Sequence, residues 1–419
     1  MTRQNWRQPA ALWNGSQCSV DMMKEARLYE KLPEGRVRCH LCAHRCVIDD
    51  GKRGICQVRE NHSGTLYTLV YGRIIAHHMD PVEKKPLFHF YPGSLAYSIA
   101  TPGCNLRCRW CQNWEISQVV REQRIVLGQR ASPEQIVAAA KRAGCRSVAY
   151  TYTEPIIFFE YAYDVALLAR AAGLANVYVT AGYMTGEMLE TSRPYLDTAN
   201  VDLKAFRDET YRKYVGARLQ PILDAMKAMK RLGLWLEVTT LVIPGVNDDD
   251  EELKDAASFI VGELGPDTPR HISRFFPAYQ MTDVPLTPLE TLRRAWKIGK
   301  EAGLHYVYVG NVMDADREST FCPQCSQLLI QRRGYDVREV WPERGACPRC
   351  GHIIPGVWEQ EEERGERRDR CQRKSSRLEP RYRGQPSSAL RSTIGWDLNR
   401  SGGWGWCSTS SAWRCFCGR

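Results

Sequence analysis

Residues 104–111 read Cys-Asn-Leu-Arg-Cys-Arg-Trp-Cys, so Cys104, Cys108 and Cys111 follow the spacing C-x3-C-x2-C. They come directly after an apolar run that predicts a strand, and after Gly103. Three thiolates on one loop can hold three corners of a [4Fe-4S] cluster, which leaves the fourth iron without a protein ligand. An iron left open in this way can bind a substrate. The alternative is a zinc site whose fourth ligand lies elsewhere.

Around this loop, short runs rich in Val, Ile and Tyr alternate with segments of helical period. The predicted strands are 97–101, 147–152, 176–180, 200–203, 235–243, 272–276 and 306–309. The predicted helices are 133–143, 156–172, 221–232, 251–264 and 288–302. Such alternation predicts an α/β fold with a parallel sheet. Periodicity alone leaves open a barrel, a partial barrel and an open doubly wound sheet.

The composition favours a globular protein of two or three domains and gives no sign of a nucleic-acid partner. The 419 residues are 43% hydrophobic, and Lys plus Arg exceed Asp plus Glu by 58 to 48. Residues 359–419 contain 13 basic and 8 acidic residues, so about half of the net charge of +10 belongs to this tail. The rest of the chain is nearly balanced, and its charge does not indicate nucleic-acid binding.

Seventeen cysteines raise the question of disulfides or metal ligands. Residues 1–20 contain no apolar export signal, and the longest uncharged stretch, 86–106, is interrupted by Pro and Gly. We therefore expect a cytoplasmic protein without a membrane segment, in a reducing compartment where clustered cysteines bind metal. Residues 1–24 and 359–419 are expected to be a disordered leader and tail. The composition of the tail differs from that of the rest of the chain, which would also fit translation in a shifted reading frame.

The loop and its surroundings resemble the radical S-adenosylmethionine (radical SAM) superfamily. Trp110 stands just before the last cysteine of the motif, as in that family, and residues 88–117 resemble the branch of the glycyl-radical-enzyme activases, which includes the pyruvate formate-lyase activating enzymes. Within it, the AmmeMemoRadiSam group is the most similar. The resemblance extends over residues 25–358 and includes "YTYTEP", "VDLKAF", "VIPGVND", "VYVGNV" and "IPGVW".

The resemblance implies a partial (β/α)6-type radical SAM barrel over residues 93–318. The three loop cysteines would hold a [4Fe-4S] cluster whose open iron binds S-adenosylmethionine (SAM). One electron from a flavodoxin or ferredoxin would split SAM to a 5′-deoxyadenosyl radical that abstracts hydrogen from an unknown substrate. A glycyl-radical-enzyme activase is one alternative, and a metal-binding RNA or protein interaction module without radical chemistry is another. Memo-type partners are implied by the same resemblance.

Candidate SAM-binding residues follow from motifs at strand ends. By resemblance, Glu154 would face the amino group of SAM, although a carboxylate before Pro155 also suits a helix N-cap. Asp202 and Lys204 share a sheet face because they are two residues apart. Lys204 would neutralise the SAM carboxylate and Asp202 would orient Lys204 or the ribose, and a purely structural ion pair is the alternative.

Other positions are weaker candidates. Trp110 is assigned to the cofactor site by the resemblance, and Gly310 would let a ligand approach the backbone after the last strand. Lys84 and Lys85 would line an entrance or belong to a solvated turn. Residues 179–182 lack the carboxylate of the activases, so no cation site is expected. Five histidines near the barrel are interpreted as ordinary partly buried residues, and no catalytic side chain is assigned: His77, His78, His89, His271 and His305.

Two further cysteine groups flank the barrel. The ribbon cysteines, Cys322, Cys325, Cys347 and Cys350, form two C-x2-C knuckles that predict a zinc-ribbon-like module over residues 319–358, with a rubredoxin-like iron as the alternative.

The N-terminal cysteines lie within residues 25–92 and are Cys39, Cys42, Cys46 and Cys56. Their thiolates suit zinc or an auxiliary [4Fe-4S] cluster, and the spacing by itself leads us to expect zinc or another structural role. An iron-sulfur cluster here would be able to relay the reducing electron.

Overall fold

The computed structural model describes residues 23–340 and 345–358. The predicted leader, 1–24, lies outside the described residues apart from its last two positions, and the predicted tail, 359–419, lies outside them entirely. Within the described ranges, no helix is both long and apolar enough to cross a membrane.

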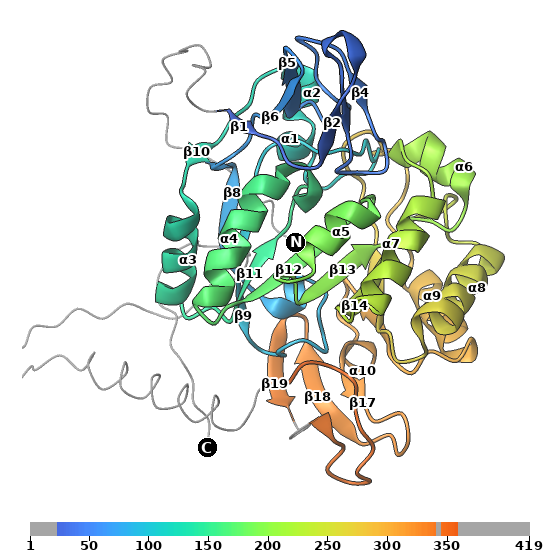
Figure 1. The fold of residues 1–419 in the computed structure, drawn as a ribbon. Helices are drawn as coiled ribbons and strands as arrows, with labels where there is room; N and C mark the ends of the chain where they lie inside the picture. The colour runs from blue at the N-terminus through green and yellow to red at the C-terminus, as the bar shows by residue number, and fades with distance from the viewer. Residues whose placement is uncertain (1–22, 341–344, 359–419) are drawn as a thin grey trace, which may run out of the picture. The chain divides into compact units, whose positions relative to one another are not determined.

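An eight-stranded sheet forms the centre of the described chain (Figure 1). In spatial order its strands are β8 (Ala76–Pro81), β9 (Leu95–Ala100), β11 (Ser147–Tyr150), β12 (Ala175–Thr180), β13 (Thr198–Asp202), β14 (Trp235–Val242), β15 (Arg270–Arg274) and β16 (Val307–Gly310). All pair in parallel except β8, which runs antiparallel to β9. Every predicted strand overlaps one of the parallel strands, so the predicted α/β fold is confirmed. The order has two unpaired edges, β8 and β16, which makes the sheet open, as in a partial barrel.

The central sheet begins before residue 93, the position predicted for the start of the barrel. Strand β8 belongs to the predicted N-terminal module and pairs with β9 from Ala76 opposite Ala100 to Pro81 opposite Leu95. Three consecutive exposed residues in β8 remove the alternation of buried and exposed side chains by which a strand is recognised. Its place in the sheet therefore had no sequence signal.

Most helices lie between consecutive strands of the central sheet in the order of the chain. The helices are α1 (Trp114–Ser117), α2 (Val119–Gln123), α3 (Pro133–Arg142), α4 (Phe159–Ala171), α5 (Gly186–Ser192), α6 (Asp208–Thr210), α7 (Gln220–Arg231), α8 (Asp250–Phe259), α9 (Leu289–Glu301) and α10 (Ala315–Glu318). The predicted helices overlap α3, α4, α7, α8 and α9. The others are seven residues or shorter, too short for a periodic apolar face to be visible in the sequence.

Small antiparallel sheets precede and follow the central sheet. The N-terminal ones contain β1 (Lys24–Glu25), β2 (Tyr29–Lys31), β3 (Val37–Cys39), β4 (Val47–Ile48), β5 (Arg59–His62) and β6 (Thr65–Thr68), and β7 (Arg73–Ile74) pairs with β10 (Gln129–Arg130). The C-terminal sheet contains β17 (Thr320–Phe321), β18 (Leu328–Arg333) and β19 (Asp336–Val340). A buried ion pair of 2.9 Å between Arg59 and Glu160 joins the N-terminal part to α4.

A buried polar network joins the segment before β9 to the sheet. The carboxylate of Glu237 accepts hydrogen bonds from the backbone of Phe88 at 2.9 Å and of His89 at 2.8 Å. His271 lies 2.7 Å from the same carboxylate. The ring of His89 is completely buried. Its Nδ1 atom lies 2.8 Å from the carbonyl of Pro355, and its Nε2 atom lies 2.7 Å from the hydroxyl of Tyr308 in β16. Both histidines are buried more fully than the sequence indicated.

The buried His89 gives folding stability a defined pH dependence. Burial lowers the pKa of His89 from 6.5 to about 4. Between these values the unfolded chain binds more protons than the folded chain, so acidification favours unfolding. From this group alone, we expect the free energy of unfolding to fall by about 2 kcal/mol between pH 7 and pH 5.

Urea unfolding of the wild type and of His89→Gln at the two pH values measures this effect. The glutamine retains hydrogen-bonding groups but does not titrate, so its loss of stability on acidification should be smaller by that amount. Equal losses in the two proteins would contradict the assignment.

Candidate active site

The loop cysteines, Cys104, Cys108 and Cys111, lie beyond the carboxyl end of β9 and face one cavity. Backbone contacts fix the loop: the N–H of Arg107 donates to the carbonyl of Val215 at 2.8 Å. The N–H of Leu106 donates to Cys104 Sγ at 3.3 Å. The loop is therefore shaped by its own backbone and by the segment after α6, and its thiols point to a common space.

Gly103 sets the entry to this loop. Its φ of +102° lies in a region that residues with a side chain rarely adopt, and a Cβ atom here would lie 2.7 Å from Val58 Cγ1. Val58 belongs to the N-terminal part of the chain. Only glycine permits this close approach between the strand-to-loop junction and the N-terminal segment.

The cavity has a volume of about 680 Å³. It lies at the carboxyl ends of the parallel strands, where parallel α/β proteins gather functional groups. Successive strands and their loops contribute, in spatial order, Cys104, Glu154, Thr180, Asp202, Leu241 and Ser273. The predicted site residues from three separate motifs are thereby brought to one space.

Glu154 is buried at the wall of the cavity. Its carboxylate accepts hydrogen bonds from Thr180 Oγ1 at 2.5 Å and from the backbone N–H of Ala181 at 2.9 Å. It also caps the 3-10 turn that begins at Pro155. Burial raises the pKa of Glu154 to about 7, more than its hydrogen bonds lower it. The N-cap interpretation is thus correct in geometry, and the same carboxylate borders the cavity.

Asp202 and Lys204 both border the cavity, on the shared face predicted from their spacing. Lys204 Nζ lies 3.1 Å from Asp202 Oδ2. Burial alone would lower the pKa of Lys204, but the carboxylate of Asp202 and the nearby Cys108 outweigh it and raise this pKa above its usual range. Lys204 is accordingly a permanent cation within the cavity wall.

Trp110 and Gly310 differ in their placement. Trp110 is buried and borders the cavity, with its ring centroid 6.2 Å from that of Tyr214. Gly310 is not among the residues that line the cavity, whereas Asn311 and Ser273 are. A Cβ at Gly310 would meet Ser273 Oγ at 3.3 Å, so the absence of a side chain here makes room for Ser273, which does line the cavity.

A charged cluster at the β8 side of the cavity was missed as a unit by sequence reasoning. Asp80 accepts hydrogen bonds from Lys84 at 2.8 Å, from Lys85 at 2.7 Å and from the hydroxyl of Tyr152. All four residues line the cavity, so the tandem lysines belong to it and do not form a simple solvated turn. Burial lowers the pKa of Lys85 to about 8. Recognising the cluster from the sequence would have required β8 to be recognised first.

Comparisons with known proteins agree with this geometry. The Radical SAM superfamily profile matches residues 98–257. An uncharacterised protein, MJ0808, of Methanocaldococcus jannaschii is 44% identical over 334 residues, which cover 79% of this chain and 99% of that protein. The chain belongs to the radical SAM superfamily.

The (2S)-3-sulfopropanediol dehydratase activating enzyme of Klebsiella oxytoca is 26% identical over 27% of this chain, a match that spans 35% of that enzyme. A radical SAM methyltransferase structure from Sphaerobacter thermophilus has 18% identity and a TM-score of 0.42, covering 57% of this chain and 71% of that one.

This radical SAM protein is therefore an enzyme, and its family implies a [4Fe-4S] cluster and SAM. The interpretation as an interaction module without radical chemistry is set aside.

The loop cysteines fit a [4Fe-4S] cluster better than a zinc ion. Among the described residues, the only set of three or more ligating atoms that all lie within 4.8 Å of one another is that of the ribbon cysteines. Thiolates bound to one zinc at 2.3 Å would be about 3.8 Å apart. The three loop sulfurs do not all lie within even 4.8 Å of one another.

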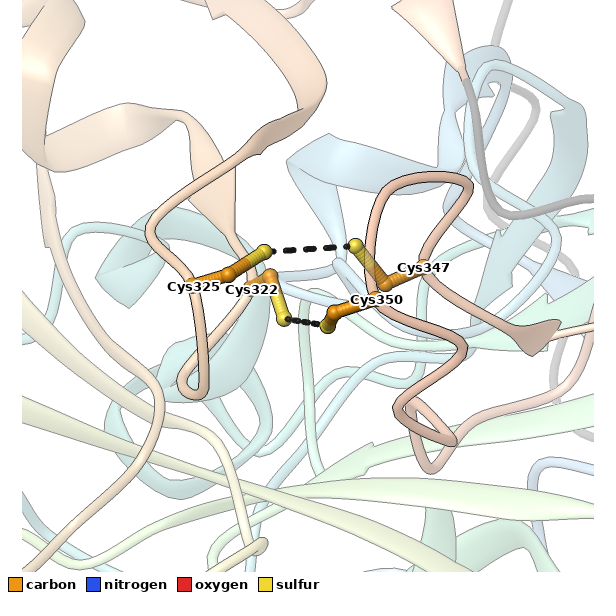
Figure 2. A group of neighbouring side chains, drawn as sticks. All are labelled: Cys322, Cys325, Cys347 and Cys350. Carbon is orange, nitrogen blue, oxygen red and sulfur yellow. Dashed lines mark hydrogen bonds between the residues drawn. The ribbon is translucent and has the colours of Figure 1, made fainter.

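The two flanking cysteine groups of the radical SAM enzyme have different geometries. In the ribbon cysteines, Cys322 Sγ lies 3.6 Å from Cys350 Sγ, and Cys325 Sγ lies 3.6 Å from Cys347 Sγ. Figure 2 shows these two knuckles facing each other. The N-terminal cysteines line a separate small cavity and do not meet the 4.8 Å condition.

Gly103→Ala should damage the active-site loop. We expect it to lower the free energy of unfolding by about 1–3 kcal/mol, through backbone strain and the clash with Val58, and to reduce the iron bound by the loop cysteines. Gly144→Ala is a matched control, because Gly144 has a φ of +71° but no atom within 4 Å of a Cβ. Urea unfolding and iron content per chain measure both effects. Full iron and unchanged stability in Gly103→Ala would refute the packing argument.

Proposed function

We propose that Cys104, Cys108 and Cys111 hold three irons of a [4Fe-4S] cluster, and that Glu154 and Lys204 bind the amino and carboxylate groups of SAM. When bound, this cluster supplies the electron that splits SAM into methionine and a 5′-deoxyadenosyl radical. The proposal is carried by one observation: these five side chains, from three separate motifs, border the same cavity.

The charges of the cavity wall complement the two ends of an amino acid. Glu154 is held by Thr180 and Ala181, so it can accept from an ammonium group without losing its orientation. Burial disfavours the ionised form of Glu154 and raises its pKa to about 7, and an arriving positive charge would favour that form again. Lys204 offers a fixed positive charge to a carboxylate, and Asp202 holds the ammonium of Lys204 in place.

The apolar part of the lining would exclude water from the reacting atoms. Leu106, Trp110, Val179 and Leu241 border the cavity together with the charged groups. A low local dielectric strengthens the charge pairs described above and protects a radical from quenching. We assign Trp110 to this packing role beside the loop cysteines.

The hydrogen donor would enter on the β8 side, where Asp80, Lys84, Lys85 and Tyr152 present polar groups to the cavity. A glycyl-radical-enzyme activase is the second candidate. It is favoured by the activating enzymes among the relatives, from Klebsiella oxytoca and from Nitratidesulfovibrio vulgaris. Their similarity covers about a quarter of this chain, so this substrate class is an analogy. The AmmeMemoRadiSam subtype, Memo-type partners and a flavodoxin or ferredoxin as reductant remain predictions from the resemblance.

For the ribbon cysteines we propose a structural zinc ion. All four sulfurs lie within 4.8 Å of one another, which suits four thiolates around a single tetrahedral ion. Four thiolates also close the coordination sphere, so such a site stabilises the C-terminal sheet and takes no part in the reaction.

Glu154→Gln and Lys204→Ala test the SAM site. Each should weaken SAM binding to the reconstituted protein about 10- to 100-fold, because a charge-assisted hydrogen bond contributes about 1.5–3 kcal/mol. Iron content should not change. Equilibrium dialysis of SAM and formation of 5′-deoxyadenosine under dithionite measure the effect, with Lys141→Ala on the exposed face of α3 as the control. Unaltered SAM affinity in both variants would rule out the assigned roles.

Cys350→Ser tests the zinc ribbon. We expect the purified variant to lose about one zinc per chain and to unfold at a lower temperature, since four thiolates are needed to close the site. The buried Cys145 lies outside all three cysteine groups, so Cys145→Ser is a matched control. Metal analysis and thermal unfolding are the measurements. Unchanged zinc, or iron where zinc is expected, would refute this proposal.

A further inference from the structure

The N-terminal cysteines form a single site. Cys39 ends β3, Cys46 immediately precedes β4, and the backbone N–H of Cys39 donates to the carbonyl of Cys46 at 3.0 Å. Cys42 and Cys56 come from the adjoining turns, and all four thiols are free of disulfides. The four side chains line one small cavity. The spacing C-x2-C-x3-C-x9-C is therefore folded into one four-thiol cage.

The sulfur positions in this cage do not suit a single ion. Zinc bound at 2.3 Å would bring four thiolates to within about 3.8 Å of one another, as the ribbon cysteines nearly are. Within residues 23–340 and 345–358, no three of the N-terminal sulfurs all lie within 4.8 Å of one another. The loop cysteines do not meet this condition either. Sulfurs that are not drawn together around one point suit a [4Fe-4S] cluster, in which each thiolate binds a different iron.

The rest of the lining also suits an iron-sulfur cluster. It is largely apolar and includes Leu41, Ile48, Ile55, Ile156 and Ile157. The lining contains no carboxylate, and its one histidine, His44, has its Nε2 atom 2.9 Å from the carbonyl of Asn105. The four cysteine thiols of the cage are enough to give each iron of such a cluster one ligand. Arg59, which is paired with the buried Glu160, borders the cage as well.

We propose that Cys39, Cys42, Cys46 and Cys56 bind a second [4Fe-4S] cluster, one whose irons all have protein ligands. Such a cluster has no open iron and cannot bind SAM. This inference does not depend on the proposed roles of Glu154 and Lys204.

The cage adjoins the active-site loop. Arg121 Nη2 donates to the carbonyl of Ile55 and to that of Cys104, each at 3.1 Å. The hydrogen bond between His44 and Asn105 makes a second connection. The segment that carries the N-terminal cysteines and the loop that carries Cys104 are therefore in contact through these side chains. Paramagnetic clusters in neighbouring segments should interact magnetically when both are reduced.

Metal analysis of the full chain, expressed and purified without oxygen, tests the proposal. The decisive variant replaces all three loop cysteines by alanine, because it removes the first cluster and leaves the cage intact. We expect about eight irons and one zinc per chain in the wild type, and about four irons and one zinc in this variant. Cys145→Ala is the matched control and should behave as the wild type.

Electron paramagnetic resonance adds a readout of ligation. The reduced triple variant should give a cluster signal that does not change when SAM is added. Serine at all four N-terminal positions should remove this cluster and leave the iron of the loop cysteines. A triple variant with no iron, or with two zincs, would overturn the proposal, and a signal that shifts with SAM would overturn four-thiolate ligation. If the triple variant does not fold, a count of about four irons per chain in the wild type would overturn the proposal.

Discussion

Parallel pairing of the strands from β9 to β16 is the constraint on which the site depends. Each strand is hydrogen-bonded in register to its neighbour, for example Tyr150 of β11 opposite Ile99 of β9 and Tyr178 of β12. Parallel strands must all end at the same edge of the sheet, and each needs a return crossover to start the next. The loop cysteines, Glu154 and Lys204 are far apart in the sequence and meet because of this pairing.

The charged groups at this edge of the sheet have hydrogen-bond partners, yet their side chains still border the cavity. Among the described residues, the carboxylate of Glu154 accepts hydrogen bonds from neutral donors and from no cation. Lys204 and Asp202 do form an ion pair, and both still border the cavity. Burying charge without full compensation is costly, and folds retain such groups where a ligand completes the arrangement. The stability comes instead from the apolar strands behind the cavity, which are almost fully buried.

The sequence predicted the strands well because apolar runs bounded by turns report burial on both faces, as in β14 and β12. Motifs at strand ends also singled out the loop cysteines, Glu154 and the Asp202–Lys204 pair, which border one cavity, while their roles as ligands stay predictions. It did not predict the Asp80 cluster, which depends on the pairing of an edge strand with exposed side chains. The role of Gly310 stays a prediction, because a glycine at a strand end fits close packing against a neighbouring side chain as well as against a ligand.

The three cysteine groups show why sequence spacing alone does not identify a metal. A C-x2-C pair occurs in both the ribbon and the N-terminal cysteines, yet only the ribbon draws its sulfurs together as a single ion requires. The difference arises from the backbone and side chains that surround each group of cysteines. In the ribbon, two similar knuckles face each other, whereas in the N-terminal part the four cysteines come from a hairpin and two turns around branched aliphatic side chains. The surroundings of each group, and not only the number of residues between cysteines, therefore decide how closely its sulfurs approach one another.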